Sequence, residues 1–132
     1  MRSNAREAAF KIIFSRLFQE GVTSGFKARM YKGEKLSEED TAFADRLVCI
    51  VEEHREELLS AIMQKVERFA ENRIYRADKA IMLLGLAEMK YCDDVPPLVS
   101  VSEAAALARK YSTENSANFV SGVLGGFIND PA

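Results

Sequence analysis

The sequence predicts a compact all-α bundle of about six or seven helices. Apolar residues recur every three or four positions along almost the whole chain, which is the period of one face of a helix. No stretch alternates apolar and polar residues as a half-buried strand does, and no Asn-Gly or Asp-Gly pair marks a hairpin. The chain has 132 residues, 48% of them hydrophobic, which suffices for one self-supporting core. We therefore expect a single helical domain over residues 1–132.

The first helix is predicted to start at Ser3 or Asn4, either of which can cap it, and to end at Gly21. Its apolar face is broad, as in a helix that packs on more than one neighbour. A short helix over residues 22–32, closed by Gly33, is expected to follow.

The longest apolar pattern covers residues 43–69 and follows Ser37-Glu38-Glu39-Asp40, which resembles a capping box. A single helix of that length is unusual in so small a domain, so we expect a kink or break near Glu53–Glu57. His54 is the only histidine and lies within the apolar stripe, which predicts a core or boundary residue.

Residues 76–91 form the most apolar segment, and a helix that is apolar on nearly all sides is the central one of a bundle. Glu88 lies in this segment, and a buried carboxylate needs a hydrogen-bond partner, which we expect from a neighbouring loop. After Pro96-Pro97, the sequence Ser100-Val101-Ser102-Glu103 predicts a cap that starts a helix over Glu103–Tyr111.

The last helix is predicted after a turn over Ser112–Asn115. This turn gathers hydroxyl and amide groups at a helix N-terminus, where a phosphate or carboxylate can bind. Capping of the helix is the simpler interpretation, and anion binding is the alternative.

The residue inventory argues against catalysis. A single histidine excludes multi-histidine metal sites, and no P-loop, GxGxxG, CxxC or HExxH motif is present. Cys49 and Cys92 lie in apolar surroundings, which predicts buried, reduced thiols. We expect a protein that is not an enzyme and has no cofactor or metal. No apolar run reaches the ~18 residues of a membrane span, and no secretory signal is seen, so we expect no membrane partner and a cytoplasmic location.

The net charge of −2 is unevenly distributed. Residues 1–35 carry eight Lys/Arg against three Asp/Glu, whereas residues 36–60 carry two against eight. Arg2 and Arg6 are one turn apart and are expected to project to the same side of the first helix. A basic N-terminal third on an acidic protein favours a local anionic partner, and a solvated helix face is the alternative.

Several motifs, taken in order, resemble the NusB family of bacterial transcription antitermination factors. The resemblance runs along almost the whole chain and is strongest over residues 76–124. It rests on the Arg2, Ala5, Arg6 and Ala8 start, Asp78–Met89, Asp94-Val95-Pro96, Val101–Ala104, Ala108–Tyr111 and Asn115–Leu124.

The resemblance implies an all-α fold of two small helical sub-bundles and a function in binding. Members of the family bind single-stranded boxA RNA of ribosomal RNA leaders together with NusE, a small ribosomal protein, and support processive synthesis by RNA polymerase. The positions that match the family's RNA-binding residues are Arg2, Arg6, Asn115, Asn118 and Phe119. The positions that match its partner-protein interface are Phe14 and Asp78.

The chain departs from the family pattern at a few of these places. Ser3 and Asn4 stand where relatives often have further arginines, and Ser121 and Gly125 replace an asparagine and an acid of the last motif. Asn115 stands where many relatives have an acid, and the loss of that negative charge favours RNA. The alternative function is a NusB-like protein–protein interaction module that has lost boxA recognition.

Overall fold

The computed structural model of the chain describes residues 2–18, 29, 31–33, 35–67 and 74–128. Most of them lie in helices, and no strand occurs within these ranges, which confirms the all-α prediction. The helices are α1 (Arg2–Phe18), α3 (Glu38–Glu67), α4 (Arg76–Tyr91), α5 (Pro97–Tyr111) and α6 (Glu114–Gly125).

Part of the short helix predicted over residues 22–32 is seen, because residues 29 and 31–33 are helical. The rest of that segment lies outside the described residues, as does Gly21, the predicted end of the first helix. None of the described helices is long and apolar enough to cross a membrane.

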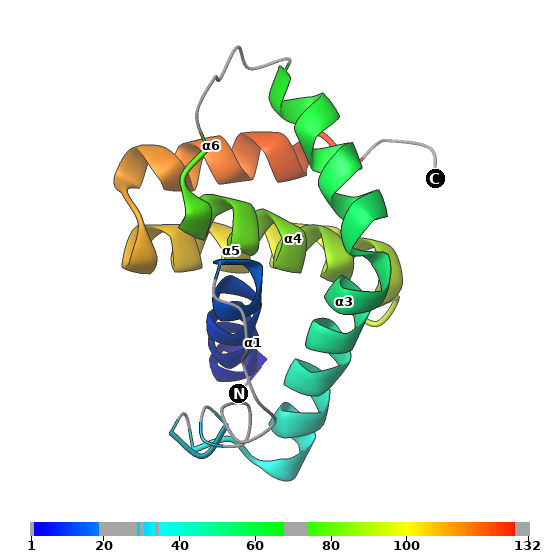
Figure 1. Ribbon diagram of the computed structural model, residues 1–132, viewed down its shortest axis with the longest axis vertical. Helices are drawn as coiled ribbons and strands as arrows, with labels where there is room; N and C mark the ends of the chain where they lie inside the picture. Colours follow the sequence, from blue (N-terminus) through cyan, green and yellow to red (C-terminus); the bar gives the residue numbers. More distant parts are fainter. Residues whose placement is uncertain (1, 19–28, 30, 34, 68–73, 129–132) are drawn as a thin grey trace.

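The most apolar segment is the central helix, as predicted. α4 contacts α1, α3, α5 and α6, and every residue from Ala80 to Glu88 is buried. In Figure 1, α5 and α6 lie along α4 as one group, and α1 and the first half of α3 form a second group below it. A Cβ at Gly85 would lie 2.7 Å from Cδ1 of Leu124 in α6, so the Leu124 side chain would have to move. Without a side chain at this position, Leu124 packs directly against the α4 backbone.

The kink predicted near Glu53–Glu57 is confirmed. His54 has non-helical backbone angles, φ −114° and ψ 18°, inside the 30-residue α3. Its ring stacks on Tyr91 of α4, with centroids 4.2 Å apart and planes 14° from parallel. His54 is half-buried, as expected for a boundary residue. The bend is visible in Figure 1 and turns the two halves of α3 in different directions.

Three expectations are wrong: the start of α5, the cap at Ser100 and the burial of Cys49. α5 begins at Pro97, six residues before Glu103, because proline at the first helical position has a suitable φ and needs no N–H partner there. Ser100 is buried inside that helix, and its hydroxyl finds no hydrogen-bond partner among the described residues, so it is not a cap. Cys49 is exposed on α3, whereas Cys92 is buried as predicted.

Candidate nucleic-acid interface

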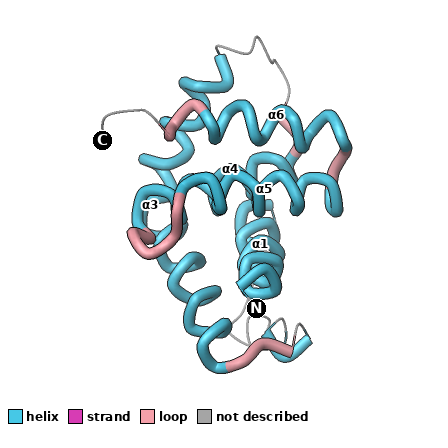
Figure 2. The backbone as a smooth tube through the Cα atoms, turned by 180° about the vertical axis from the view of Figure 1, so that it is seen from behind, coloured by secondary structure: helices cyan, strands magenta, loops and turns pink. Residues whose placement is uncertain are grey.

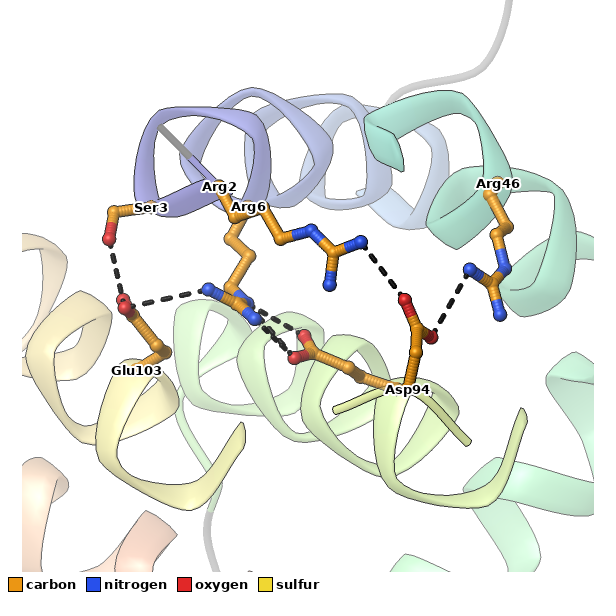
Figure 3. Close-up of polar contacts among 7 residues, drawn as sticks. Arg2, Ser3, Arg6, Arg46, Asp94 and Glu103 are labelled. Atoms are coloured by element: carbon orange, nitrogen blue, oxygen red, sulfur yellow. Dashed lines mark hydrogen bonds and ion pairs between the residues drawn. The ribbon is translucent and has the colours of Figure 1, made fainter. Parts of the chain in front are cut away.

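The start of α1 carries two arginines that behave differently. Arg2 is exposed and donates to Oδ2 of Asp94, in the turn between α4 and α5, at 2.9 Å. Its guanidinium carbon lies 4.2 Å from the centroid of the Phe43 ring on α3, within the range of a cation–π contact. The side chain, 45% exposed, is therefore held at the surface, and Figure 3 shows its guanidinium directed toward Asp94.

Arg6 projects to the same side of α1 as Arg2, as predicted, since both guanidinium groups lie over the Phe43 ring, but Arg6 is buried and is not part of an exposed basic face. Arg6 points into the protein and donates through Nε and Nη2 to the two carboxylate oxygens of Glu88, at 2.8 and 2.6 Å. Glu103 of α5 lies 3.5 Å from the same guanidinium. The position one turn into α1 faces α4, so its side chain meets the buried carboxylate rather than solvent (Figure 3).

The buried Arg6–Glu88 pair has a clear physical basis. Burial by itself lowers the pKa of Arg6, but the hydrogen bonds and negative charge of Glu88 outweigh this and raise it. Glu88 thus obtains the partner that its burial requires. That partner comes from α1, not from a neighbouring loop as expected.

The N-terminus of α6 presents the second group of predicted residues. Asn115 and Asn118 are exposed, and Phe119 is half-buried. A spacing of three and four residues places all of them on one face of the helix. This face offers two side-chain amides next to an aromatic ring, which suits the edges and faces of unstacked bases.

The hydroxyl cluster before α6 is a cap, as the simpler interpretation holds. Oγ1 of Thr113 accepts from the backbone N–H of Ser116 at 2.9 Å. The hydroxyls of Ser112 and Thr113 both lie within hydrogen-bond distance of the Ser116 hydroxyl, at 2.9 and 3.0 Å. The hydroxyls are therefore engaged with one another and with the first turn of α6.

α5 connects the two groups of predicted residues. Ser3 donates to Glu103 near its middle, and Lys110 at its end lies 2.6 Å from Glu7 of α1. Arg109 pairs with Glu114 of α6 at 3.2 Å. In Figure 2, the view from behind, α5 crosses the upper end of α1 and α6 lies above α5. Exposed cations thus lie at the start of α1 (Arg2) and at the end of α5 (Arg109 and Lys110), each paired with a carboxylate.

Three exposed basic residues of this region are absent from the sequence-based list. Arg109 and Lys110 belong to a motif on which the family resemblance rests. Their position just before the α6 cap could therefore have identified them as candidate RNA-binding residues. Arg46 lies on α3 and also reaches Asp94. It falls in the most acidic part of the chain, and nothing in the sequence distinguishes it.

The two residues assigned to a partner protein lie on different helices, Phe14 on α1 and Asp78 on α4. Phe14 lines an apolar groove of about 310 Å³ together with Phe10, Lys11, Ser15, Ala77 and Tyr111. Asp78 follows Ala77 in the chain but is buried, with a relative exposure of 2%, and does not line the groove. Its Oδ1 accepts no hydrogen bond from the described residues. The carboxylate lies in the first turn of α4, where the helix dipole favours negative charge, and it does not reach the surface.

Comparison with known proteins gives a consistent result. The NusB family model matches residues 3–129. The transcription antitermination protein NusB of Agathobacter rectalis is 34% identical over 96% of this chain and 98% of its own length. A crystal structure of the antitermination factors NusB and NusE with double-stranded RNA superposes with a TM-score of 0.83, at 22% identity, over 96% of this chain and 95% of that one. NusB from T. maritima superposes with a TM-score of 0.84, at 24% identity, over 100% and 93%.

Proposed function

The chain belongs to the NusB family, and from this we propose that it is an RNA-binding transcription antitermination adaptor. It binds boxA-type single-stranded RNA together with a NusE-type small ribosomal protein, and so supports processive synthesis of ribosomal RNA by RNA polymerase. It acts in the cytoplasm through binding alone and catalyses no reaction. The proposal rests on the two groups of residues near the ends of α5. Exposed Arg2 lies near one end, and the face of α6 that carries Asn115, Asn118 and Phe119 lies at the other.

The chemistry of this surface matches single-stranded RNA. Arg2 and Lys110 supply exposed positive charge for backbone phosphates, which gives affinity without reading sequence. Phe119 supplies a ring for base stacking, and the amides of Asn115 and Asn118 can hydrogen-bond to base edges.

Arg6 contributes to the same surface as a positioning residue. Its ion pairs with Glu88 and Glu103 tie the start of α1 to α4 and α5. The backbone that carries Arg2 is thereby fixed relative to α6. Arg6 itself is too deeply buried to meet RNA.

The partner protein is proposed to bind at the apolar groove around Phe14. An apolar side chain of the partner would cover Phe14, which lies three turns along α1 from Arg2, and would meet the RNA surface at Tyr111, whose ring lies beside Lys110. Asp78 lies buried in the first turn of α4, which also carries the groove residue Ala77. It would therefore act through the position of that turn and not by touching the partner.

The test is fluorescence anisotropy with a labelled single-stranded boxA-type RNA, at about 50 mM and about 200 mM salt, with and without the NusE-type partner. We expect affinity that falls steeply with salt and rises with the partner. Arg2→Gln should weaken binding about tenfold and flatten the salt dependence, because one phosphate contact is lost. The matched control is Arg55→Gln, an exposed arginine elsewhere on α3, which should bind as the wild type does.

Two outcomes would contradict the proposal. Binding of the partner without RNA binding in any condition would indicate the protein–protein module instead. RNA binding that responds equally to Arg2→Gln and Arg55→Gln would place the RNA on another surface.

A further inference from the structure

Asp94 lies between two guanidinium groups that come from different helices. Arg2 of α1 donates to its Oδ2 at 2.9 Å, and Nη1 of Arg46 of α3 lies 3.5 Å from its Oδ1. Nη2 of Arg46 also lies 3.4 Å from the carbonyl oxygen of Tyr91. Figure 3 shows the two arginines approaching Asp94 from opposite sides.

All three side chains of this cluster are solvent-accessible, with exposures of 44% to 48%. The contacts of Arg46 are at the long end of the hydrogen-bond range, so its guanidinium retains donors for another acceptor. The hydrogen bond and charge of Arg2, with a smaller effect of Arg46, lower the pKa of Asp94. Asp94 is therefore an anion at neutral pH, and it occupies the place where an external anion would meet both guanidinium groups.

The Arg2 guanidinium is also held in position before any ligand arrives, by a ring on the helix that carries Arg46. The Arg2 guanidinium lies over the ring of Phe43, which is buried and fixed in the core, and Arg46 follows Phe43 by three residues on α3. Two forked guanidinium groups facing one acidic group form an arrangement that suits a phosphate, whose oxygens can accept from both forks.

We propose that Arg46 and Arg2 together bind one backbone phosphate of the RNA, and that Asp94 occupies this phosphate position in the free protein. The RNA path then extends beyond the start of α1 onto α3. Asp94 acts as an internal competitor, so the RNA phosphate that enters this position must displace the Asp94 carboxylate. This inference rests on the proposed function, since Arg2 belongs both to this cluster and to the proposed RNA surface.

The experiment compares four forms of the full chain by anisotropy of the same boxA-type RNA across a salt series. We expect Arg46→Gln to weaken binding about five- to tenfold and to reduce the slope of log affinity against log salt by about 0.7, the value for one single-strand phosphate contact. Arg55→Gln, on the same helix, should leave both quantities unchanged. Asp94→Asn keeps the size of the side chain and removes its charge, and it should tighten binding several-fold at low salt.

The outcomes separate this inference from the proposed function. Wild-type protein that binds no RNA overturns both. Wild-type protein that binds, with Arg46→Gln indistinguishable from Arg55→Gln, overturns the role of Arg46 and leaves the proposed function in place. Asp94→Asn that binds no more tightly than the wild type overturns the role of Asp94 as competitor. Circular dichroism and thermal unfolding of each variant establish that the folded chain is being compared.

Discussion

The same kinds of charged residue serve two purposes at opposite ends of one helical turn of α1. In the interior, the Arg6 and Glu88 side chains are 5% and 2% exposed and form a bidentate pair. At the surface, Arg2 and Asp94 are 45% and 48% exposed, and Arg46 shares the carboxylate. A buried charge that loses its partner is costly, whereas exposed pairs contribute little to stability. The interior pair therefore fixes α1 in place, and the surface cluster is free to exchange a carboxylate for a phosphate.

The largest effect is expected at the buried pair. Glu88→Leu should lower the free energy of unfolding by about 3–5 kcal/mol, because it leaves the Arg6 guanidinium buried beside only the partly exposed Glu103. Urea denaturation followed by circular dichroism measures this change.

The matched control for Glu88→Leu removes both charges at once. The double variant Arg6→Met with Glu88→Leu should recover most of the lost stability, since apolar side chains of similar size can replace a buried ion pair. Asp94→Asn should leave the urea midpoint unchanged. A Glu88→Leu variant as stable as the wild type would remove the distinction between the two regions.

A neutral interaction at the other end of the surface should have an intermediate effect. Thr113 caps α6, and Thr113→Ala should destabilise the protein by about 1 kcal/mol, because the N–H of Ser116 loses its acceptor. Thr113→Ser retains the hydroxyl and is the control. The same cap orients Asn115 and Asn118, so we also expect weaker RNA binding in Thr113→Ala at equal salt. Equal unfolding midpoints for the alanine and serine variants would show that the cap does not hold this end of the surface.

Helical periodicity was sufficient to predict the fold. The nearly uniform apolar character of residues 80–87 identified α4 as the central helix, because a helix that is apolar on all sides must be covered by neighbours on all sides. The length of the pattern over 43–69 predicted the kink at His54, although the stacking on Tyr91 depends on tertiary contacts. The start of α5 was misplaced because two N-terminal signals competed, and proline at the first position prevailed over the Ser100 cap.

The candidate site was only partly predictable. The family resemblance, and not helical spacing, brought Asn115, Asn118 and Phe119 together, and in the structure all three lie on α6. Spacing on α1 correctly put Arg2 and Arg6 on one side, but helical period does not show which helix lies opposite, so the burial of Arg6 was missed. Arg46 and Asp94 come together across 48 residues, and no local pattern carries that information.

Glu7 is intermediate between the two regions, and pH offers a measurement of its contribution. It follows Arg6 on α1, its side chain is 14% exposed, and it accepts from Lys110 and Tyr111 of α5. Burial alone raises the pKa of Glu7, but these hydrogen bonds and the charge of Lys110 outweigh it and lower the pKa below the ordinary 4.5. A carboxyl whose pKa is lower in the folded chain stabilises that chain above its unfolded pKa, and the contribution disappears as the pH falls through the folded pKa.

Glu7→Gln should therefore be less stable than the wild type at pH 7, and the difference should shrink as the pH falls below about 4.5. Urea denaturation at a series of pH values from neutral to acidic measures it. The effect should be smaller than that of Glu88→Leu, because Glu7 retains contact with solvent and glutamine can still accept from Tyr111. A difference that stays constant over the whole pH range would mean that Glu7 contributes through packing and not through its charge. The contact between α1 and the end of α5 would then be stabilised by packing. Only at the start of α1 would the stability contributions of buried and exposed ion pairs differ.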